Sequence, residues 1–219
     1  LPPRVKIIIF SAAETQRTQR KHDDNYTKIF ESFAANSIIQ TLVFSVTSVC
    51  SVAKVIIRMP RIFVSIGSNI EREKNLRGAV RALRDAYGTL ALSRVYESAP
   101  QGFTGDNFYN LVAAFDTGES IEAVKARLAA IETAHGRVRG DRRLAPRTLD
   151  LDLLLYDNAV IHRAGLDLPR AEIQEYAFVL APLAEIAPDL RHPETGETYR
   201  ELWEKFRPRL ELRPVSLAL

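Results

Sequence analysis

The sequence has very little cysteine, methionine or tryptophan, with one residue of each among its 219. The single Cys50 excludes an internal disulfide framework and suits a reducing compartment, so we expect a cytoplasmic protein. Long apolar runs are also scarce. The longest, residues 42–57, includes Lys54 and is shorter than the roughly 20 residues that a membrane-spanning helix needs. We therefore expect no membrane association.

A strong overall charge is absent as well. The formal net charge is +3, and residues 1–58 carry +4 of it, which leaves −1 for the rest of the chain. Because the basic character belongs to the first segment, we do not predict a nucleic-acid partner. The length suits one domain of about 150 residues plus an extension, and the 46% hydrophobic content is ordinary for a globular protein.

The first 58 residues differ from the rest. They begin with Leu1, and the only methionine, Met59, stands directly before a predicted strand. A membrane anchor and a signal peptide are alternatives, but the apolar run is short for the first and starts too deep in the chain for the second. We expect that translation starts at Met59 and that residues 1–58 form a poorly packed N-terminal extension outside the native fold.

The most informative stretch is residues 147–156, which reads Arg-Thr-Leu-Asp-Leu-Asp-Leu-Leu-Leu-Tyr. In a strand, Asp150 and Asp152 point to one face and the alternating leucines to the other. Two carboxylates on one face of a buried strand repel each other and lose hydration. A hard divalent cation, Mg²⁺, is the simplest positive group to lie between them. For the carboxylate pair taken alone, a frayed strand end or pairing with nearby arginines is the favoured interpretation, and the preceding segment changes this balance.

An arginine-rich loop precedes this strand. Five arginines fall between Arg137 and Arg147, with two glycines and a proline nearby. The planar guanidinium group suits phosphate oxygens. Alone, such a loop is more simply a solvated basic segment. Together with the carboxylate pair, it favours phosphoryl-type transfer from a nucleoside triphosphate.

The segment R-x-x-P-R-T-L-D-L-D-L-L-L-Y resembles the signature of the 6-hydroxymethyl-7,8-dihydropterin pyrophosphokinase family of folate biosynthesis. Four further segments support the resemblance, which covers about residues 61–206: Val64–Asn69, Tyr109-Asn110, Glu132 with Gly136–Arg139, and Phe178–Pro188. It implies that residues 59–219 form an ATP-dependent diphosphotransferase. Such an enzyme moves pyrophosphate from ATP to the hydroxymethyl group of the reduced pterin and releases AMP.

The resemblance also implies roles for individual residues. Asp150 and Asp152 would hold two Mg²⁺ ions on the triphosphate of the co-substrate ATP, and Arg137, Arg139 and Arg147 would act on the phosphates. The implied nucleotide-binding residues are Glu132, Arg139, Arg147 and Arg170. The implied pterin-binding residues are Gly67, Ser98, Pro100, Phe108, Asn110 and Phe178. An aromatic ring and an amide on one strand face, as at Phe108 and Asn110, also suit a flat heterocycle.

Hydrophobic periodicity predicts strands over residues 61–66, 90–96, 108–117, 147–156 and 159–161, and helices over 75–87, 120–135, 177–186 and 199–206. The order β-α-β-β-α-β is the ferredoxin-like arrangement. We therefore predict an α+β fold with a ferredoxin-like core and appended C-terminal helices. Residues 98–106 and 139–145 have loop composition, and we expect them to close over bound nucleotide.

Several positions depart from the family pattern: Leu144, Arg170, Ala171 and Tyr176. Family members often carry Trp, His and Arg at the first, second and last of these positions. A non-catalytic pterin- or nucleotide-binding relative, and a pyrophosphokinase for a modified pterin, therefore remain alternatives to the working enzyme. We expect a monomer whose partners are small molecules, ATP and the reduced pterin.

Overall fold

The computed structural model describes residues 6–7, 56–57, 59–137, 146–206 and 212–219. It divides the chain into two units, residues 1–58 and residues 59–219. In the first unit the described strands β1 (Lys6–Ile7) and β2 (Ile56–Ile57) pair antiparallel. Within the described residues, no helix is long and apolar enough to cross a membrane.

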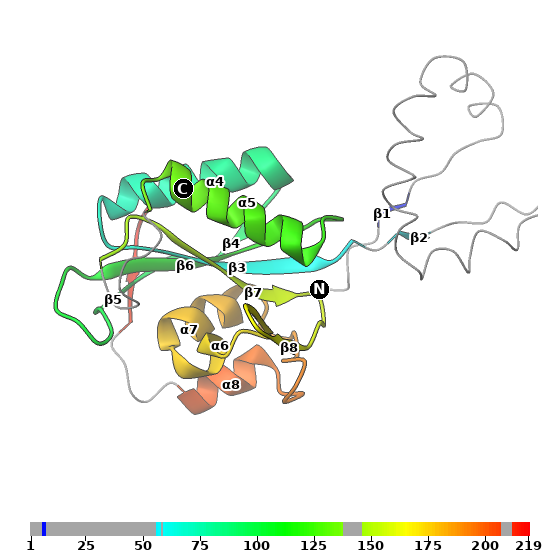
Figure 1. Cartoon of the computed structure of the whole chain (residues 1–219). Coiled ribbons are helices and arrows are strands. Elements are labelled where there is room, and N and C mark those ends of the chain that lie inside the picture. Colours follow the sequence, from blue (N-terminus) through cyan, green and yellow to red (C-terminus); the bar gives the residue numbers. More distant parts are fainter. Residues whose placement is uncertain (1–5, 8–55, 58, 138–145, 207–211) are drawn as a thin grey trace, which may run out of the picture. The chain divides into compact units, whose positions relative to one another are not determined.

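The second unit is built on one antiparallel sheet (Figure 1). Its strands lie in the order β10-β5-β6-β3-β7, and β4 pairs with β6 beside β5. Their bounds are β3 (Arg61–Ser68), β4 (Ala91–Leu92), β5 (Val95–Ser98), β6 (Phe108–Asp116), β7 (Asp150–Tyr156) and β10 (Arg213–Val215). The central strands β3 and β6 are buried along almost their whole length, because helices cover both faces of the sheet.

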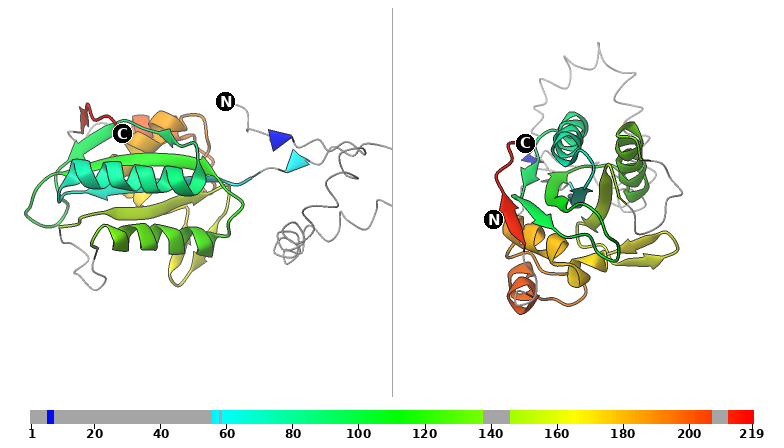
Figure 2. Two further views of the ribbon diagram at one scale, coloured as in Figure 1. Left: turned by 90° about the horizontal axis from the view of Figure 1, so that it is seen from above. Right: turned by 90° about the vertical axis from the view of Figure 1, so that its left-hand side faces the viewer.

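Two helices, α4 (Arg72–Tyr87) and α5 (Ile121–Ala134), lie side by side on one face of the sheet (Figure 2). Each helix buries apolar residues at helical spacing, Leu76 and Leu83 on α4 and Leu128 on α5, against the leucines and isoleucines of the sheet. The hydroxyl of Ser120 accepts the N–H of Ala123 and so caps α5, as its sequence predicts.

The other face is covered by α6 (Glu172–Glu175), α7 (Ala177–Ile186) and α8 (Tyr199–Phe206). Their buried side chains join a second core with Phe63, Val112 and Leu154 of the sheet. Between β7 and these helices stands a hairpin of β8 (Ile161–Arg163) and β9 (Leu166–Leu168). A cis peptide bond joins Leu168 to Pro169 at its end.

The α+β class and the antiparallel sheet are confirmed, and the predicted bounds of α7 and α8 match. The single strand predicted over residues 90–96 is wrong. It is broken into β4 and β5 because the Ser93 hydroxyl accepts the N–H of Val112 and donates to the carbonyl of Arg94. The short strand predicted at 159–161 begins at Ile161 instead, and β9, α6 and β10 were not predicted.

Candidate active site

The strand register brings predicted site residues into one row. Gly67 of β3 pairs with Asp150 of β7 on one side and with Asn110 of β6 on the other. Paired residues of antiparallel strands point to the same face of the sheet. A Cβ atom at Gly67 would lie 3.0 Å from Asn110 Oδ1 and 4.0 Å from Asp150 Cβ. Because Gly67 has no side chain, the sheet surface between the Asn110 amide and the Asp150 carboxylate stays open.

Arginines contact both predicted metal-binding carboxylates. Arg137 donates to Asp150 Oδ1 at 2.5 Å, and Arg147 donates to Asp150 Oδ2. Arg170 forms an ion pair with Asp152 at 2.8 Å. The arginine pairing that the sequence left open as an alternative is therefore present. It lies at a partly exposed site that a ligand can reach, since the Asp150 and Asp152 side chains keep 18% and 35% of their surface exposed.

The two carboxylates differ in their electrostatic surroundings. Burial raises the pKa of Asp152 to about 6, and the neighbouring charge of Asp150 adds to the rise. The positive charge of Arg170 opposes this rise without cancelling it. The positive charge of Arg170 therefore does not fully offset the cost of burying ionised Asp152, so a cationic ligand would stabilise this carboxylate.

The donor set fits a hard divalent cation that is shared with a ligand. Among the described residues, no group of three or more His, Cys, Asp and Glu side chains could hold a metal ion. A cation held by Asp150 and Asp152 would have two carboxylate groups as ligands and would need phosphate oxygens or water for the rest. Mg²⁺ is commonly bound in this way, through one or two carboxylates plus substrate phosphates.

Glu132, near the C-terminal end of α5, is buried beside the same strand. Its carboxylate accepts the backbone N–H of Leu151 at 2.8 Å and the guanidinium of Arg137. Burial raises the pKa of Glu132, while these two donors oppose the rise. Because β7 is the last strand of the sheet, the Leu151 N–H lies on the outer edge of β7, and Glu132 accepts its hydrogen bond there.

A cavity of about 390 Å³ lies over the Asp150–Gly67–Asn110 row. Tyr176 stacks on Phe178 with ring centroids 5.0 Å apart, and Phe103 meets Phe108 edge to face. The cavity is lined by Ser65, Gly67, Ser98, Ala99, Gln101, Phe103, Phe108, Asn110, Arg137, Arg147, Asp150, Asp152, Leu154, Arg170, Glu172, Glu175, Tyr176, Phe178 and Val179. Aromatic rings line one part of it, and charged groups line another.

Asn110 is oriented within this cavity. Its Nδ2 donates to the hydroxyl of Ser98 at 2.9 Å, which leaves Oδ1 on the side of Gly67. A fixed amide next to aromatic rings offers a flat heterocycle both stacking surface and a hydrogen-bonding edge.

Buried Asn69 connects the two loops that border this cavity. Its Nδ2 donates to the carbonyl of Asp106 at 3.2 Å, and its Oδ1 accepts the N–H of Arg147 at 2.6 Å. The N–H of Asn69 in turn donates to the carbonyl of Arg147. The loop before β6 and the segment before β7 are thus held to the end of β3.

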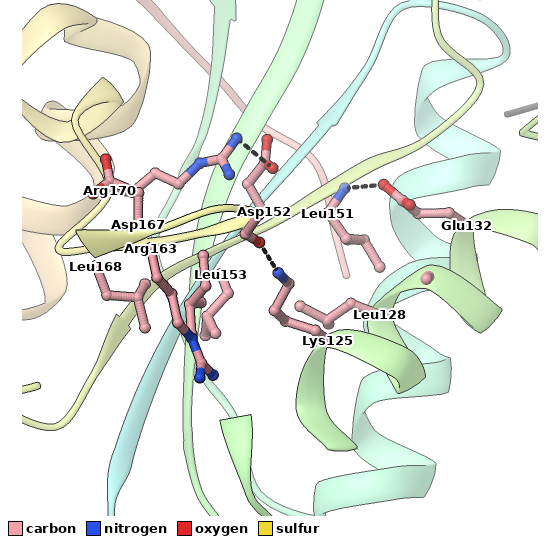
Figure 3. Close-up of a pocket in the computed structure, with 13 residues that line it drawn as sticks. Lys125, Leu128, Glu132, Leu151, Asp152, Leu153, Arg163, Asp167, Leu168 and Arg170 are labelled. Atoms are coloured by element: carbon pink, nitrogen blue, oxygen red, sulfur yellow. Dashed lines mark hydrogen bonds and ion pairs between the residues drawn. The ribbon is translucent and has the colours of Figure 1, made fainter. Parts of the chain in front are cut away.

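A second cavity, of about 380 Å³, lies on the other side of β7, between α5 and the β8–β9 hairpin (Figure 3). Leu128, Leu151, Leu153, Leu166 and Leu168 supply the aliphatic part of its walls. Charged residues stand at its margins: Lys125, Glu132, Asp152, Arg163, Asp167 and Arg170. Lys125 donates to the carbonyl of Gly165 and so links α5 to the tip of the hairpin.

Asp152 and Arg170 line both cavities. Figure 3 shows the Arg170 side chain directed at Asp152 between the hairpin and β7. The two cavities thus meet at a carboxylate and a guanidinium. A group passed from a ligand in one cavity to a ligand in the other would cross this junction.

The structure brings most of the predicted site residues together. Gly67, Ser98, Phe108, Asn110 and Phe178 line the first cavity, and Glu132 lines the second. The first cavity is lined by Ala99 and Gln101 rather than by the predicted Pro100 that stands between them. The predicted Arg139, the departure at Leu144 and the predicted lid over residues 139–145 lie outside the described residues.

Sequence reasoning missed several lining residues. Ser65 stands two positions before Gly67 on β3, so strand alternation could have placed it on the same face. Phe103 and Gln101 lie in a loop, and Glu172 and Glu175 lie in a four-residue helix. No periodic signal marks those four positions.

Comparisons with known proteins agree on one family. The profile described as 7,8-dihydro-6-hydroxymethylpterin-pyrophosphokinase matches residues 63–188. The 2-amino-4-hydroxy-6-hydroxymethyldihydropteridine pyrophosphokinase of Methylorubrum extorquens is 42% identical over 154 residues, which are 68% of this chain and 96% of that protein. The Pseudomonas aeruginosa protein of the same name is 41% identical over 141 residues, covering 61% of this chain and 85% of its own length.

A solved structure shows the same fold. The crystal structure titled Plasmodium falciparum HPPK-DHPS wild type with STZ-DHP superposes with a TM-score of 0.55 at 14% sequence identity. The superposition covers 68% of this chain but only 41% of that longer chain.

Proposed function

We infer that this chain, which belongs to the 7,8-dihydro-6-hydroxymethylpterin-pyrophosphokinase family, carries out its reaction where the two cavities meet. It transfers pyrophosphate from ATP to the hydroxymethyl group of 6-hydroxymethyl-7,8-dihydropterin and releases AMP, a step of folate biosynthesis. The observation that carries the placement of the reaction is that Asp152 and Arg170 line both cavities.

The first cavity takes the pterin. Phe108 and Phe178 supply ring surfaces, and Asn110 supplies a hydrogen-bonding edge that the Ser98 hydroxyl fixes in place. Gly67 contributes by having no side chain, since a Cβ there would crowd the Asn110 amide. The hydroxymethyl group of the bound pterin then points along the sheet surface at Gly67 toward Asp150 and Asp152.

The second cavity takes the nucleoside of ATP, with its triphosphate at the junction. Its leucines suit a base and sugar, and its charged residues include Asp152 and Arg170, which it shares with the first cavity. Glu132 stands in the wall next to β7, where it also fixes Leu151. Arg137, Arg147 and Arg170 lie within reach of phosphates at the junction, and Arg139 would join them from the loop before β7.

Asp150 and Asp152 would hold two Mg²⁺ ions, as their paired carboxylates fit hard cations that also bind phosphate oxygens. When bound, such ions withdraw negative charge from the phosphates. The hydroxymethyl oxygen attacks the β-phosphorus, the bond from that phosphorus to the oxygen bridging to the α-phosphate breaks, and AMP leaves with that oxygen. The hydroxyl proton is released to the leaving AMP or to water. The arginines neutralise charge on the leaving AMP, so positioning and charge supply most of the barrier reduction and no strong base is required.

Further properties belong to the same proposal. The strand order β7-β3-β6-β5, with α4 and α5 on one face, supports a ferredoxin-like core extended by α6, α7 and α8. We propose a cytoplasmic monomer of which residues 59–219 are the enzyme and residues 1–58 are an extension that catalysis does not need.

Binding measurements on two variants test the assignment of the cavities. Phe108→Ala should raise the Kd of the pterin and leave that of α,β-methylene-ATP unchanged. Ala129→Phe projects a ring from α5 into the second cavity. It should raise the Kd of α,β-methylene-ATP and leave that of the pterin unchanged. Ala130→Phe, on the exposed side of α5, is the matched control. If both ligands respond to the same variant, the two-cavity assignment is wrong; if the pterin binds and is never pyrophosphorylated, the chain is a non-catalytic pterin-binding relative.

A further inference from the structure

Arg170 is held beside Asp152 by its backbone as well as by its charge. Its N–H donates to the carbonyl of Leu154 at 3.0 Å, two residues along β7 from Asp152. Its Nη2 lies 2.8 Å from Asp152 Oδ1 and 3.1 Å from Glu172 Oε1. The guanidinium therefore occupies the position from which a cation would approach Asp152 (Figure 3).

The guanidinium is not fully satisfied in this arrangement. Its Nε atom is buried and has no hydrogen-bond partner among the described residues. A buried donor without an acceptor costs free energy, which another orientation of the side chain could recover. Since Arg170 lines both cavities, an acceptor in either of them lies within reach of the side chain.

A divalent cation on Asp152 and a guanidinium on the same carboxylate exclude each other. Two positive charges a few ångströms apart repel each other strongly in a partly buried site. Asp150 carries guanidinium groups of its own, from Arg137 and Arg147, so an approaching cation meets a positive charge at either carboxylate. A cation can take Asp152 only if Arg170 moves away, and phosphate oxygens are strong acceptors for a released guanidinium.

We propose that Arg170 is an exchangeable counter-ion of Asp152. In the free protein it pairs with the carboxylate. When a divalent cation and a nucleotide bind together, it leaves Asp152 to the cation and turns to a phosphate oxygen. This inference rests on the proposed function, because it takes Asp152 as a metal ligand and the adjoining cavity as the nucleotide site.

The exchange couples the two ligands. Without nucleotide, the cation must displace Arg170 with no phosphate to receive the guanidinium, so metal binding is weak. With nucleotide present, the displaced guanidinium gains a phosphate, and metal binding is stronger. By reciprocity, the metal raises nucleotide affinity by the same factor.

Calorimetric titration of the full chain with Mn²⁺, with and without α,β-methylene-ATP, tests this proposal. Arg170→Gln should bind Mn²⁺ on the order of tenfold more tightly than wild type without nucleotide, and it should lose most of the gain that nucleotide gives wild type. Arg170→Lys keeps a competing charge and should stay close to wild type. Arg200→Gln is the matched control, since Arg200 also pairs with an aspartate, Asp189, but lines neither cavity.

If Arg170→Gln damaged the fold, Mn²⁺ binding would weaken. If the substitution removes the guanidinium that competes for Asp152, Mn²⁺ binding strengthens, so the two effects differ in sign. Asp152→Asn separates this proposal from the one it rests on. If Asp152→Asn binds Mn²⁺ as wild type does, the metal site itself is misassigned. If Asp152→Asn loses Mn²⁺ while Arg170→Gln binds it no more tightly than wild type, the counter-ion proposal alone is overturned.

Discussion

Asp152→Asn should stabilise the folded protein at neutral pH while it removes a carboxylate that the reaction uses. The folded structure raises the pKa of Asp152 to about 6 from its usual value of 3.8, chiefly through burial. Folding therefore favours the neutral side chain over the charged one. Asparagine has the same shape and carries no charge, so the variant avoids the cost of burying a carboxylate.

The size of the effect follows from the pKa difference. A change from 3.8 to about 6 corresponds to about 3 kcal/mol at 1.36 kcal/mol per unit. Because 35% of the side chain is exposed, solvent screening reduces this, and we expect about 1 kcal/mol. The pKa is raised in the folded state, so the cost is absent below about pH 4, grows between about pH 4 and 6, and is complete above that range.

Urea unfolding of the wild type and the variant at pH 8 and at pH 4 measures this effect. Asp152→Asn should be more stable by about 1 kcal/mol at pH 8 and equally stable at pH 4. Asp85→Asn, at an exposed position of α4, is the control and should change stability by less than about 0.5 kcal/mol at either pH. A variant that is less stable than wild type at pH 8 would show that the Arg170 ion pair outweighs burial, and would refute this reasoning.

Three further changes test other parts of the structure. Gly67→Ala places a Cβ 3.0 Å from Asn110 Oδ1 and should raise the KM for the pterin without changing the KM for ATP; equal effects on both would contradict the proposed pterin site. Tyr199→Phe removes a buried hydroxyl that has no partner among the described residues, and should raise the free energy of unfolding by about 1 kcal/mol in urea titrations, whereas a loss would reveal a missed partner. Deleting residues 213–219 removes β10 and the packed Leu217 and Leu219 and should cost about 3 kcal/mol; an unchanged melting temperature would show that this tail does not support the fold.

Local patterns predicted most of the central elements. Alternation over residues 147–156 placed Asp150 and Asp152 on one face, and the structure puts both carboxylates in one cavity. Helical spacing and an unbroken apolar run located α7 to the residue. These features depend on neighbours in the sequence, so a single segment contains the information that defines them.

The missed features depend on partners that are distant in the sequence. β10 contains Pro214 and shows no alternation, and it becomes a strand only because the edge of β5 is free to pair with it. Glu132 stands near the C-terminal end of a helix, where a carboxylate opposes the helix dipole. Its role as acceptor for Leu151 becomes visible only once β7 is known to end the sheet. The ion pair of Arg170 with Asp152 likewise needs the turn that follows β9.

The most direct test of the central claim is the product balance of the reaction. The 219-residue chain is incubated with Mg-ATP and 6-hydroxymethyl-7,8-dihydropterin, and AMP and the pterin diphosphate are quantified beside Asp152→Asn. We predict equal amounts of the two products from the wild type and at least a hundredfold loss in the variant, the order of magnitude expected when a charge-stabilising group is removed. AMP without pterin diphosphate, or full activity in Asp152→Asn, would contradict transfer at the junction of the two cavities.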